Sequence, residues 1–211
     1  MACVPRENMR SVHATGIAGP GTVNRRVTGA IVRLFRPLLK VNMVAYRLEM
    51  TSGLFPADSP EGEVVGPDAC RMLFIGDTAA SGYGVLNQGL AVVSQTARYV
   101  AREHRIGCSW SAINDPVLIM SRATSEIAKT TTDVDIVVVV LGVPDVLLGT
   151  TVAEWTAQLR QLIATVREGA SSECQVVVAG IPPMHRFRTM PRFLQRILAL
   201  QIQRLNRGSR Q

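Results

Sequence analysis

A glycine-rich loop carries the side chains of this sequence that are best placed to do chemistry. Residues 71–85, RMLFIGDTAASGYGV, set an apolar run directly before Gly76, Asp77 and Thr78. An apolar run too short for a helix indicates a strand covered on both faces, and ligands bind at the carboxyl ends of such strands in open α/β sheets. A hydroxyl directly after the strand can serve as a nucleophile, so Thr78 is the candidate nucleophile.

The same loop allows two other interpretations. Backbone N–H groups of a glycine-rich turn at the start of a helix can bind phosphate, although this loop matches neither G-x-x-x-x-G-K-[ST] nor G-x-G-x-x-G. The loop could also be a purely structural strand-to-helix turn in which Thr78 caps the helix.

The rest of the chain supplies the elements that would position this loop. Apolar periodicity predicts strands at 72–75, 107–113, 134–141 and 175–179, and helices at 86–104, 116–129, 151–169 and 191–206. Residues 134–141, VDIVVVVL, are apolar on both faces, which predicts the central strand of the sheet. Thr151 and Glu154 predict a capping box at the start of one helix. The alternation predicts an α/β fold with a parallel sheet and helices on both faces.

The chain before residue 69 differs in composition from this α/β domain, which we assign to residues 69–211. Residues 1–27 mix Gly, Arg, Asn and Thr without periodicity and are expected to form a flexible leader, with no signal peptide evident. Residues 28–50 predict a basic amphipathic helix that either packs across the domain or lies on a membrane surface. Residues 51–68 contain Gly, Pro and acidic residues and predict a linker.

The predicted N-terminal helix has two distinct faces. Its apolar face is formed by Ile31, Leu34, Phe35, Leu38, Ala45 and Tyr46, and its basic face by Arg33, Arg36, Lys40 and Arg47. Pro37 would either kink this helix or begin a second segment. The charges recur too often for a membrane span.

The net charge of +7 is unevenly distributed. Lys and Arg outnumber Asp and Glu by 8 to 2 in residues 1–50 and by 7 to 0 in residues 181–211, whereas the acids outnumber the bases by 14 to 8 in between. Because no nucleic-acid-binding motif or aromatic cluster accompanies the basic residues, we expect no nucleic acid partner. The basic ends are either an ordinary solvated surface or a binding surface for an anionic membrane.

The spacing of the cysteines indicates whether the chain has a metal site or disulfides, and hence the cellular compartment. Cys3, Cys70, Cys108 and Cys174 lie far apart without a C-x-x-C pair, which favours neither a zinc site nor a disulfide framework. We therefore expect no metal or cofactor and a reducing, cytoplasmic location, with peripheral association at a membrane as the open alternative.

Three blocks of the sequence together resemble the SGNH, or GDSL-type, hydrolase family. They are FIGDTAASGYGV after the first strand, VVVVLGVPDVLLGT at the third and VVVAGIPPMHRF at the fourth, and the resemblance covers about residues 69–206. It implies a flavodoxin-like three-layer α/β/α fold. It also implies hydrolysis of small carboxylic esters by a hydroxyl nucleophile, a histidine base and an oxyanion hole.

The resemblance assigns roles to individual residues. Thr78 stands at the position of the nucleophilic serine, keeping the hydroxyl and adding a methyl group, and Asp77 accompanies it. The oxyanion and substrate-binding positions implied by the blocks are Gly76, Ala79, Gly142 and Asp145.

The sequence departs from the family pattern at the catalytic positions. The glycine of the second block would fall near residues 114–117, which contain none, and the asparagine of the third block falls on Pro144, which lacks an N–H. The family's Asp-x-x-His would lie beyond Asn206, and none follows before Gln211, so we expect the C-terminal part of the family fold to be missing. His185, after the fourth strand, is the candidate substitute base.

These departures predict a weak or inactive esterase. The alternative is a binding module or pseudoenzyme that uses the same loop for a phosphate, a flavin, an acyl ligand or a protein partner. Since an incomplete fold would leave apolar surface open, we also expect self-association.

Overall fold

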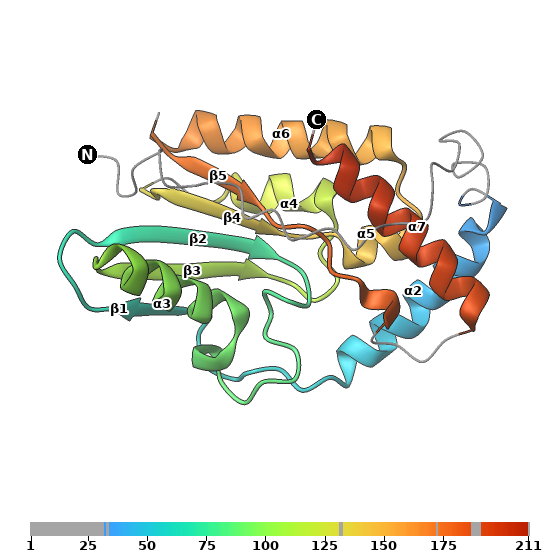
Figure 1. Cartoon of the computed structure of the whole chain (residues 1–211), viewed down its shortest axis with the longest axis horizontal. Coiled ribbons are helices and arrows are strands. Elements are labelled where there is room, and N and C mark those ends of the chain that lie inside the picture. Colours follow the sequence, from blue (N-terminus) through green and yellow to red (C-terminus); the bar gives the residue numbers. More distant parts are fainter. Residues whose placement is uncertain (1–31, 33, 131–132, 172, 187–190, 211) are drawn as a thin grey trace.

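A five-stranded sheet forms the centre of the structure, a computed structural model that describes residues 32, 34–130, 133–171, 173–186 and 191–210 (Figure 1). Its strands are β1 (Glu61–Val64), β2 (Cys70–Gly76), β3 (Cys108–Asn114), β4 (Ile136–Val140) and β5 (Gln175–Val178), in the spatial order β1-β3-β2-β4-β5. Strands β2 to β5 pair in parallel, and β1 is antiparallel to β3 at one edge. Counted in chain order, the parallel strands follow the order 2-1-3-4 of flavodoxin-like sheets.

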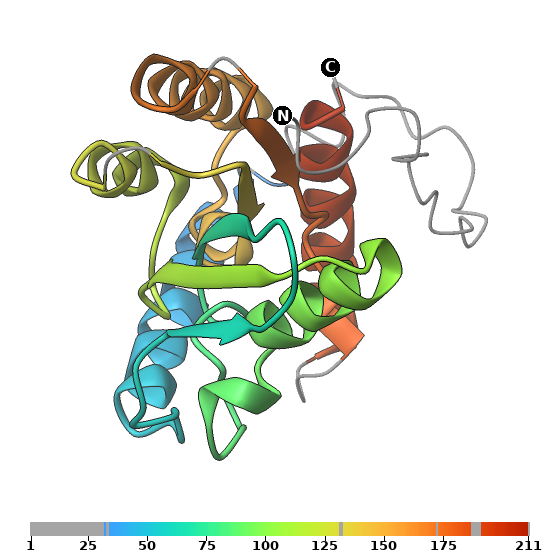
Figure 2. The ribbon, with the colours of Figure 1, turned by 90° about the vertical axis from the view of Figure 1, so that its left-hand side faces the viewer.

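Helices cover both faces of this sheet. Figure 2 shows α4 (Met120–Ile127) and α6 (Val152–Gly169) on one side and α3 (Val92–His104) on the other. Helix α7 (Arg192–Gly208) contacts α5 (Val143–Leu148) and α6, and α2 (Arg36–Thr51) contacts α5. Short 3₁₀ turns occur at Gln88–Leu90 (η2) and Met184–Arg186 (η3). The layering confirms the expected α/β/α fold, with an antiparallel edge strand that the sequence did not predict.

The central strand is β2, and its side chains alternate between two apolar cores. Leu73 and Ile75 pack in the core beneath α4 and α6, whereas Met72 and Phe74 pack in the core beneath α3. This alternation is the reason for the unbroken apolar run at residues 72–75. The prediction that residues 134–141 form the central strand was wrong, since β4 lies one place nearer the edge, between β2 and β5.

Most predicted elements are present, with shifted ends. The capping box at α6 is confirmed, because Thr151 accepts from the Glu154 N–H and the Glu154 carboxylate accepts from the Thr151 N–H. The helix expected at 86–104 begins only at Val92, after the turn η2. Strand β1 lies inside the expected linker 51–68, and α5 directly follows β4; neither was predicted. Strand β1 alternates exposed and half-buried residues, as a short edge strand does.

Helix α2 buries a different face from the predicted one. Its buried side chains are Leu39, Met43, Tyr46 and Met50, so Tyr46 is the only buried member of the expected apolar face among the described residues. Ile31 and Arg33 lie outside the described residues. Pro37 sits in the first turn, where its missing N–H leaves no helical bond unmade.

No helix within the described parts of the chain is both long enough and apolar enough to cross a bilayer.

Candidate functional site

The carboxyl end of β2 opens into the loop that holds most of the predicted site residues. Gly76 ends the strand where there is no space for a side chain, since a Cβ atom there would lie 2.4 Å from Ala80 Cβ and 2.7 Å from the Val140 carbonyl oxygen. Asp77 and Thr78 follow directly, at the point where β2 lies between its neighbours β3 and β4. In flavodoxin-like sheets this switch point is where ligands bind.

The Asp77 side chain links the loop after β2 to the segment after β4 by hydrogen bonds. It is 2% exposed, and its Oδ2 accepts hydrogen bonds from the backbone N–H groups of Gly142 at 2.8 Å and Val143 at 2.9 Å. Burial raises the pKa of this carboxyl to about 7, although hydrogen bonds from the backbone of Val143, Gly142 and Ala79 act in the opposite direction. Asp77 therefore joins the loop after β2 to the loop after β4.

Asp145 is a second buried carboxyl held by the fold. Its Oδ2 accepts from the Met120 N–H at the start of α4, and its Oδ1 accepts from the Thr150 hydroxyl, each at 3.0 Å. Burial raises its pKa, and its charge contributes to the raised pKa of Asp77. The observed bonds of both carboxyls go to protein groups that position α4, α5 and α6.

The Thr78 hydroxyl is enclosed by helix α2 and the loop after β3. Its Oγ1 hydrogen-bonds the Tyr46 hydroxyl, and both hydroxyls reach the carbonyl oxygen of Pro116, at 3.1 Å from Thr78 and 2.8 Å from Tyr46. The Met50 sulfur lies 3.8 Å away on the same side of α2. The hydroxyls of Thr78 and Tyr46 have one proton each, so the two protons are shared among their own oxygens and the carbonyl oxygen of Pro116.

Sequence reasoning missed Tyr46 as a site residue. Its phenol ring lies on the buried face of α2, and a buried tyrosine hydroxyl requires a polar partner. That requirement was a signal that Tyr46 has a polar partner. The partner, Thr78, is 32 residues away, and no local sequence pattern connects Tyr46 with Thr78.

The expected oxyanion positions are largely occupied by structural contacts. The Gly142 N–H donates to Asp77, and a Cβ at this residue, whose φ is 137°, would lie 2.4 Å from Ile181 Cγ1. The N–H of Ala79 also faces the Asp77 carboxyl, while the Ala79 side chain is exposed. Asn114 donates its side-chain amide to the Ala80 carbonyl at 3.3 Å. Pro144 contributes no N–H.

His185 lies in η3, after the carboxyl end of β5. Its Nδ1 is buried and has no hydrogen-bond partner among the described residues, and burial together with the charge of Arg186 lowers its pKa. Within the described chain, no histidine hydrogen-bonds to Thr78. His104 ends α3, and His13 lies outside the described residues.

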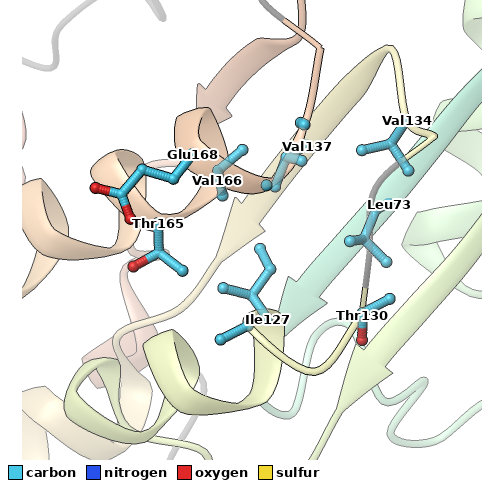
Figure 3. A pocket seen from close by; sticks show the side chains of 11 residues that line it. Leu73, Ile127, Thr130, Val134, Val137, Thr165, Val166 and Glu168 are labelled. Carbon is cyan, nitrogen blue, oxygen red and sulfur yellow. The ribbon is translucent and has the colours of Figure 1, made fainter.

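A separate cavity lies on the side of the sheet covered by α4 and α6. It measures about 240 Å³, and Figure 3 shows Leu73, Ile127 and Val137 among the apolar side chains that line it, with Thr165 and Glu168 on α6. Thr78 is not among its lining residues. No group of three or more His, Cys, Asp or Glu side chains in the described ranges could hold a metal ion.

Comparison with known proteins finds a family for the sequence. The model of the GDSL-like lipase/acylhydrolase family matches residues 74–211. Two solved structures are similar, one described as AlinE4, an SGNH-hydrolase family esterase, and the other as a mutant of the same esterase. They are 17% and 18% identical in sequence, each with a TM-score of 0.48 over 69% of this chain and 75% of the other. No curated protein matches the chain.

Proposed function

Because the chain belongs to the GDSL-like lipase/acylhydrolase family, as its sequence blocks indicated, we propose that its Thr78 loop takes a small acyl ester and hydrolyses it weakly or not at all. Family membership suggests the class of reaction and substrate. The geometry around Thr78 determines how much of that reaction we expect to remain.

The observation that carries the proposal is the set of partners of the Thr78 hydroxyl. A hydroxyl becomes a nucleophile when an adjacent base removes its proton. Here its hydrogen-bond partners are the Tyr46 hydroxyl, the Pro116 carbonyl and the Met50 sulfur, and a thioether sulfur is too weakly basic to take the proton. A neutral phenol is a poor base and a carbonyl oxygen cannot hold the proton. Loss of a catalytic base typically costs on the order of 10⁴ or more in rate.

The backbone donors support the same expectation. An oxyanion hole needs N–H groups directed at the position where negative charge develops, and each donor lost costs roughly 10² to 10³ in rate. The N–H groups of Gly142 and Val143 are directed at Asp77, and Pro144 has none. The side chain at the family's asparagine position is therefore unable to assist a tetrahedral intermediate.

Hydrolysis of short-chain p-nitrophenyl esters tests the proposal. We expect the full chain to turn over these esters at most slightly faster than Thr78→Ala, with Thr96→Ala as the matched control, since the Thr96 hydroxyl bonds the Val92 carbonyl within its own helix. Turnover far above that of Thr78→Ala, and retained in Thr96→Ala, would contradict the proposal. A simultaneous loss in His185→Ala would then assign His185 as the base.

A non-catalytic binding module is the second candidate. It is favoured by the Tyr46 contact, which uses the hydroxyl at the nucleophile position to hold α2 in place. In this alternative the Thr78 loop binds an acyl ligand, a phosphate, a flavin or a protein partner without turnover. Specific ligand binding without turnover, abolished in Thr78→Ala, would distinguish it from an esterase with weak activity.

Self-association is a proposal about partners. Strand β5 is the edge of the sheet opposite β1, and all four of its residues are half-buried. Edge strands are the usual sites at which a sheet pairs with a strand of another chain. Sedimentation at several concentrations would test it, and a monomer at every concentration would contradict it.

A further inference from the structure

The outer side of helix α2 is an exposed apolar face that the fold does not use. We define this outer face by Leu34, Val41, Val44 and Leu48, whose exposed fractions are 75%, 65%, 59% and 68%. Within α2, Val41, Val44 and Leu48 follow the i, i+3, i+7 spacing of one helical stripe, and Leu34 lies two turns earlier. Contiguous apolar side chains on a surface mark interaction sites more often than isolated ones do.

The outer face lies opposite the face that holds α2 on the domain. The packed side chains are Leu39, Met43, Tyr46 and Met50. At 3.6 residues per turn, the mean directions of the two sets differ by about half a turn. The helix is therefore apolar on two opposite sides, and packing against the domain accounts for one of them only.

Exposed apolar side chains also occur just beyond the end of α2. Leu54 is 79% exposed, and its carbonyl accepts from the Gly84 N–H at 2.9 Å. Tyr83, 44% exposed, packs its ring on Phe55 at 5.5 Å between centroids and donates its hydroxyl to Glu49. Figure 1 shows α2, the segment after it and the loop before η2 along one side of the molecule.

Positive charge flanks the outer face. Arg36, Lys40 and Arg47 are exposed on α2, and Glu49 is the one acidic residue of this helix. The rings of Phe35 and Phe193 lie 6.5 Å apart, which places the start of α7, with the exposed Arg192, beside the start of α2. Helix α7 carries no acidic residue. The start of α7 thus adds a further positive charge near the start of α2.

We infer that the outer face of α2 docks on the surface of an anionic lipid bilayer. An apolar stripe flanked by long basic side chains fits the boundary between acyl chains and negatively charged headgroups, because the stripe inserts while the charged tips remain at the headgroups. A second copy of the chain fits less well, since it would bring the same positive charges face to face. The inserted residues are those of the outer face, and α2 stays in its packed position.

Co-sedimentation of the full chain with vesicles tests this inference. We expect binding to vesicles that contain phosphatidylglycerol, little binding to pure phosphatidylcholine and release by salt. The double variant Lys40→Gln/Arg47→Gln should weaken partitioning by about 25-fold, at about fivefold for each cation removed. Leu48→Asn should weaken it by at least about tenfold, since a buried leucine contributes more than that.

Matched controls use residues of the same type far from α2. Val65, 92% exposed in the turn between β1 and β2, and the exposed Arg160 of α6 provide Val65→Asn and Arg160→Gln, which should partition like the unchanged chain. Leu48→Asn leaves the Thr78 hydroxyl and its bonds unchanged, which separates membrane docking from the proposed esterase site. Circular dichroism checks that each variant is folded.

Three outcomes would overturn the inference. The first is equal pelleting, or none, with neutral and anionic vesicles. The second is an equal effect of the outer-face variants and their controls. The third is a concentration-dependent dimer that Leu48→Asn abolishes, which would assign the outer face to a second copy of the chain.

Discussion

The Tyr46 hydroxyl on α2 hydrogen-bonds the Thr78 hydroxyl in the loop after β2, and the carbonyl of Pro116 accepts from this pair. The residue that we propose as the counterpart of the family's nucleophile therefore joins α2 to the loop at the end of β2. This contact gives Thr78 a role in stability that can be measured independently of any activity.

A double-mutant cycle should detect this coupling. Tyr46→Phe and Thr78→Val each remove a hydroxyl with little change in shape, and each should lower the free energy of unfolding by about 1 kcal/mol. Because the two groups are direct partners, the combined loss should differ from the sum of the single losses by at least about 0.5 kcal/mol. Denaturant unfolding measures all four proteins, and strictly additive losses would show that the contact contributes nothing in solution.

The buried Asp77 should make stability depend on pH. Its pKa rises from 3.8 to about 7 on folding, so the folded state binds the proton more tightly than the unfolded chain. The free energy of unfolding should therefore be highest below about pH 4, fall as the pH rises to about 7, and level off above it, with a change of up to about 4 kcal/mol.

Asp77→Asn should flatten this dependence, leaving a smaller slope of the same sign from Asp145, whose pKa burial also raises. The control Asp133→Asn changes a side chain that is 87% exposed beside Arg71, and it should not remove the dependence that is assigned to Asp77. If the free energy of unfolding increases between pH 4 and 7 in the unchanged protein, but not in Asp77→Asn, then folding lowers the pKa of Asp77 and the prediction is wrong.

Gly84 and Gly142 both have positive φ, but only Gly142 lacks space for a Cβ atom, so alanine variants of the two compare backbone strain with and without crowding. Gly142 (φ 137°) has Ile181 Cγ1 2.4 Å from the position of a Cβ, whereas Gly84 (φ 79°) has no atom within 4 Å of that position. Gly84→Ala should cost about 1 to 2 kcal/mol from backbone strain alone. Gly142→Ala should cost at least about 1 to 3 kcal/mol more, because Ile181 has to move. Equal thermal shifts in the two variants would mean that the crowding at Gly142 is relieved at no cost.

Local signals predicted most of the fold. The apolar run of β2, the spacing within α6 and its capping box each lie within a few residues of sequence, and the structure contains all three. Strand β1 and helix α5 were missed because they are short and their packing, rather than their composition, determines their conformation. The order of the strands depends on contacts across the sheet, which explains the wrong choice of central strand.

The site was predictable in position but not in its bonding. The glycine-rich loop pointed to Gly76, Asp77 and Thr78 because strand ends and turn residues are local features. The same sequence could not show that Gly142 and Val143 donate to Asp77, or that Tyr46 reaches Thr78. The face of α2 was misassigned because two apolar stripes compete on one helix, and only its packing against α5 and the rest of the core decides which one is buried.

The packing of α2 also sets the size of the cooperative folding unit. The family match begins at Phe74, midway along β2, yet Leu39, Met43 and Met50 belong to the same core as Ile75 and Trp155. A fragment cut at the start of the match would lose half of its central strand and uncover the core beneath α2. The smallest autonomous unit therefore begins before residue 74, where the family match starts, and it includes residues 36–51.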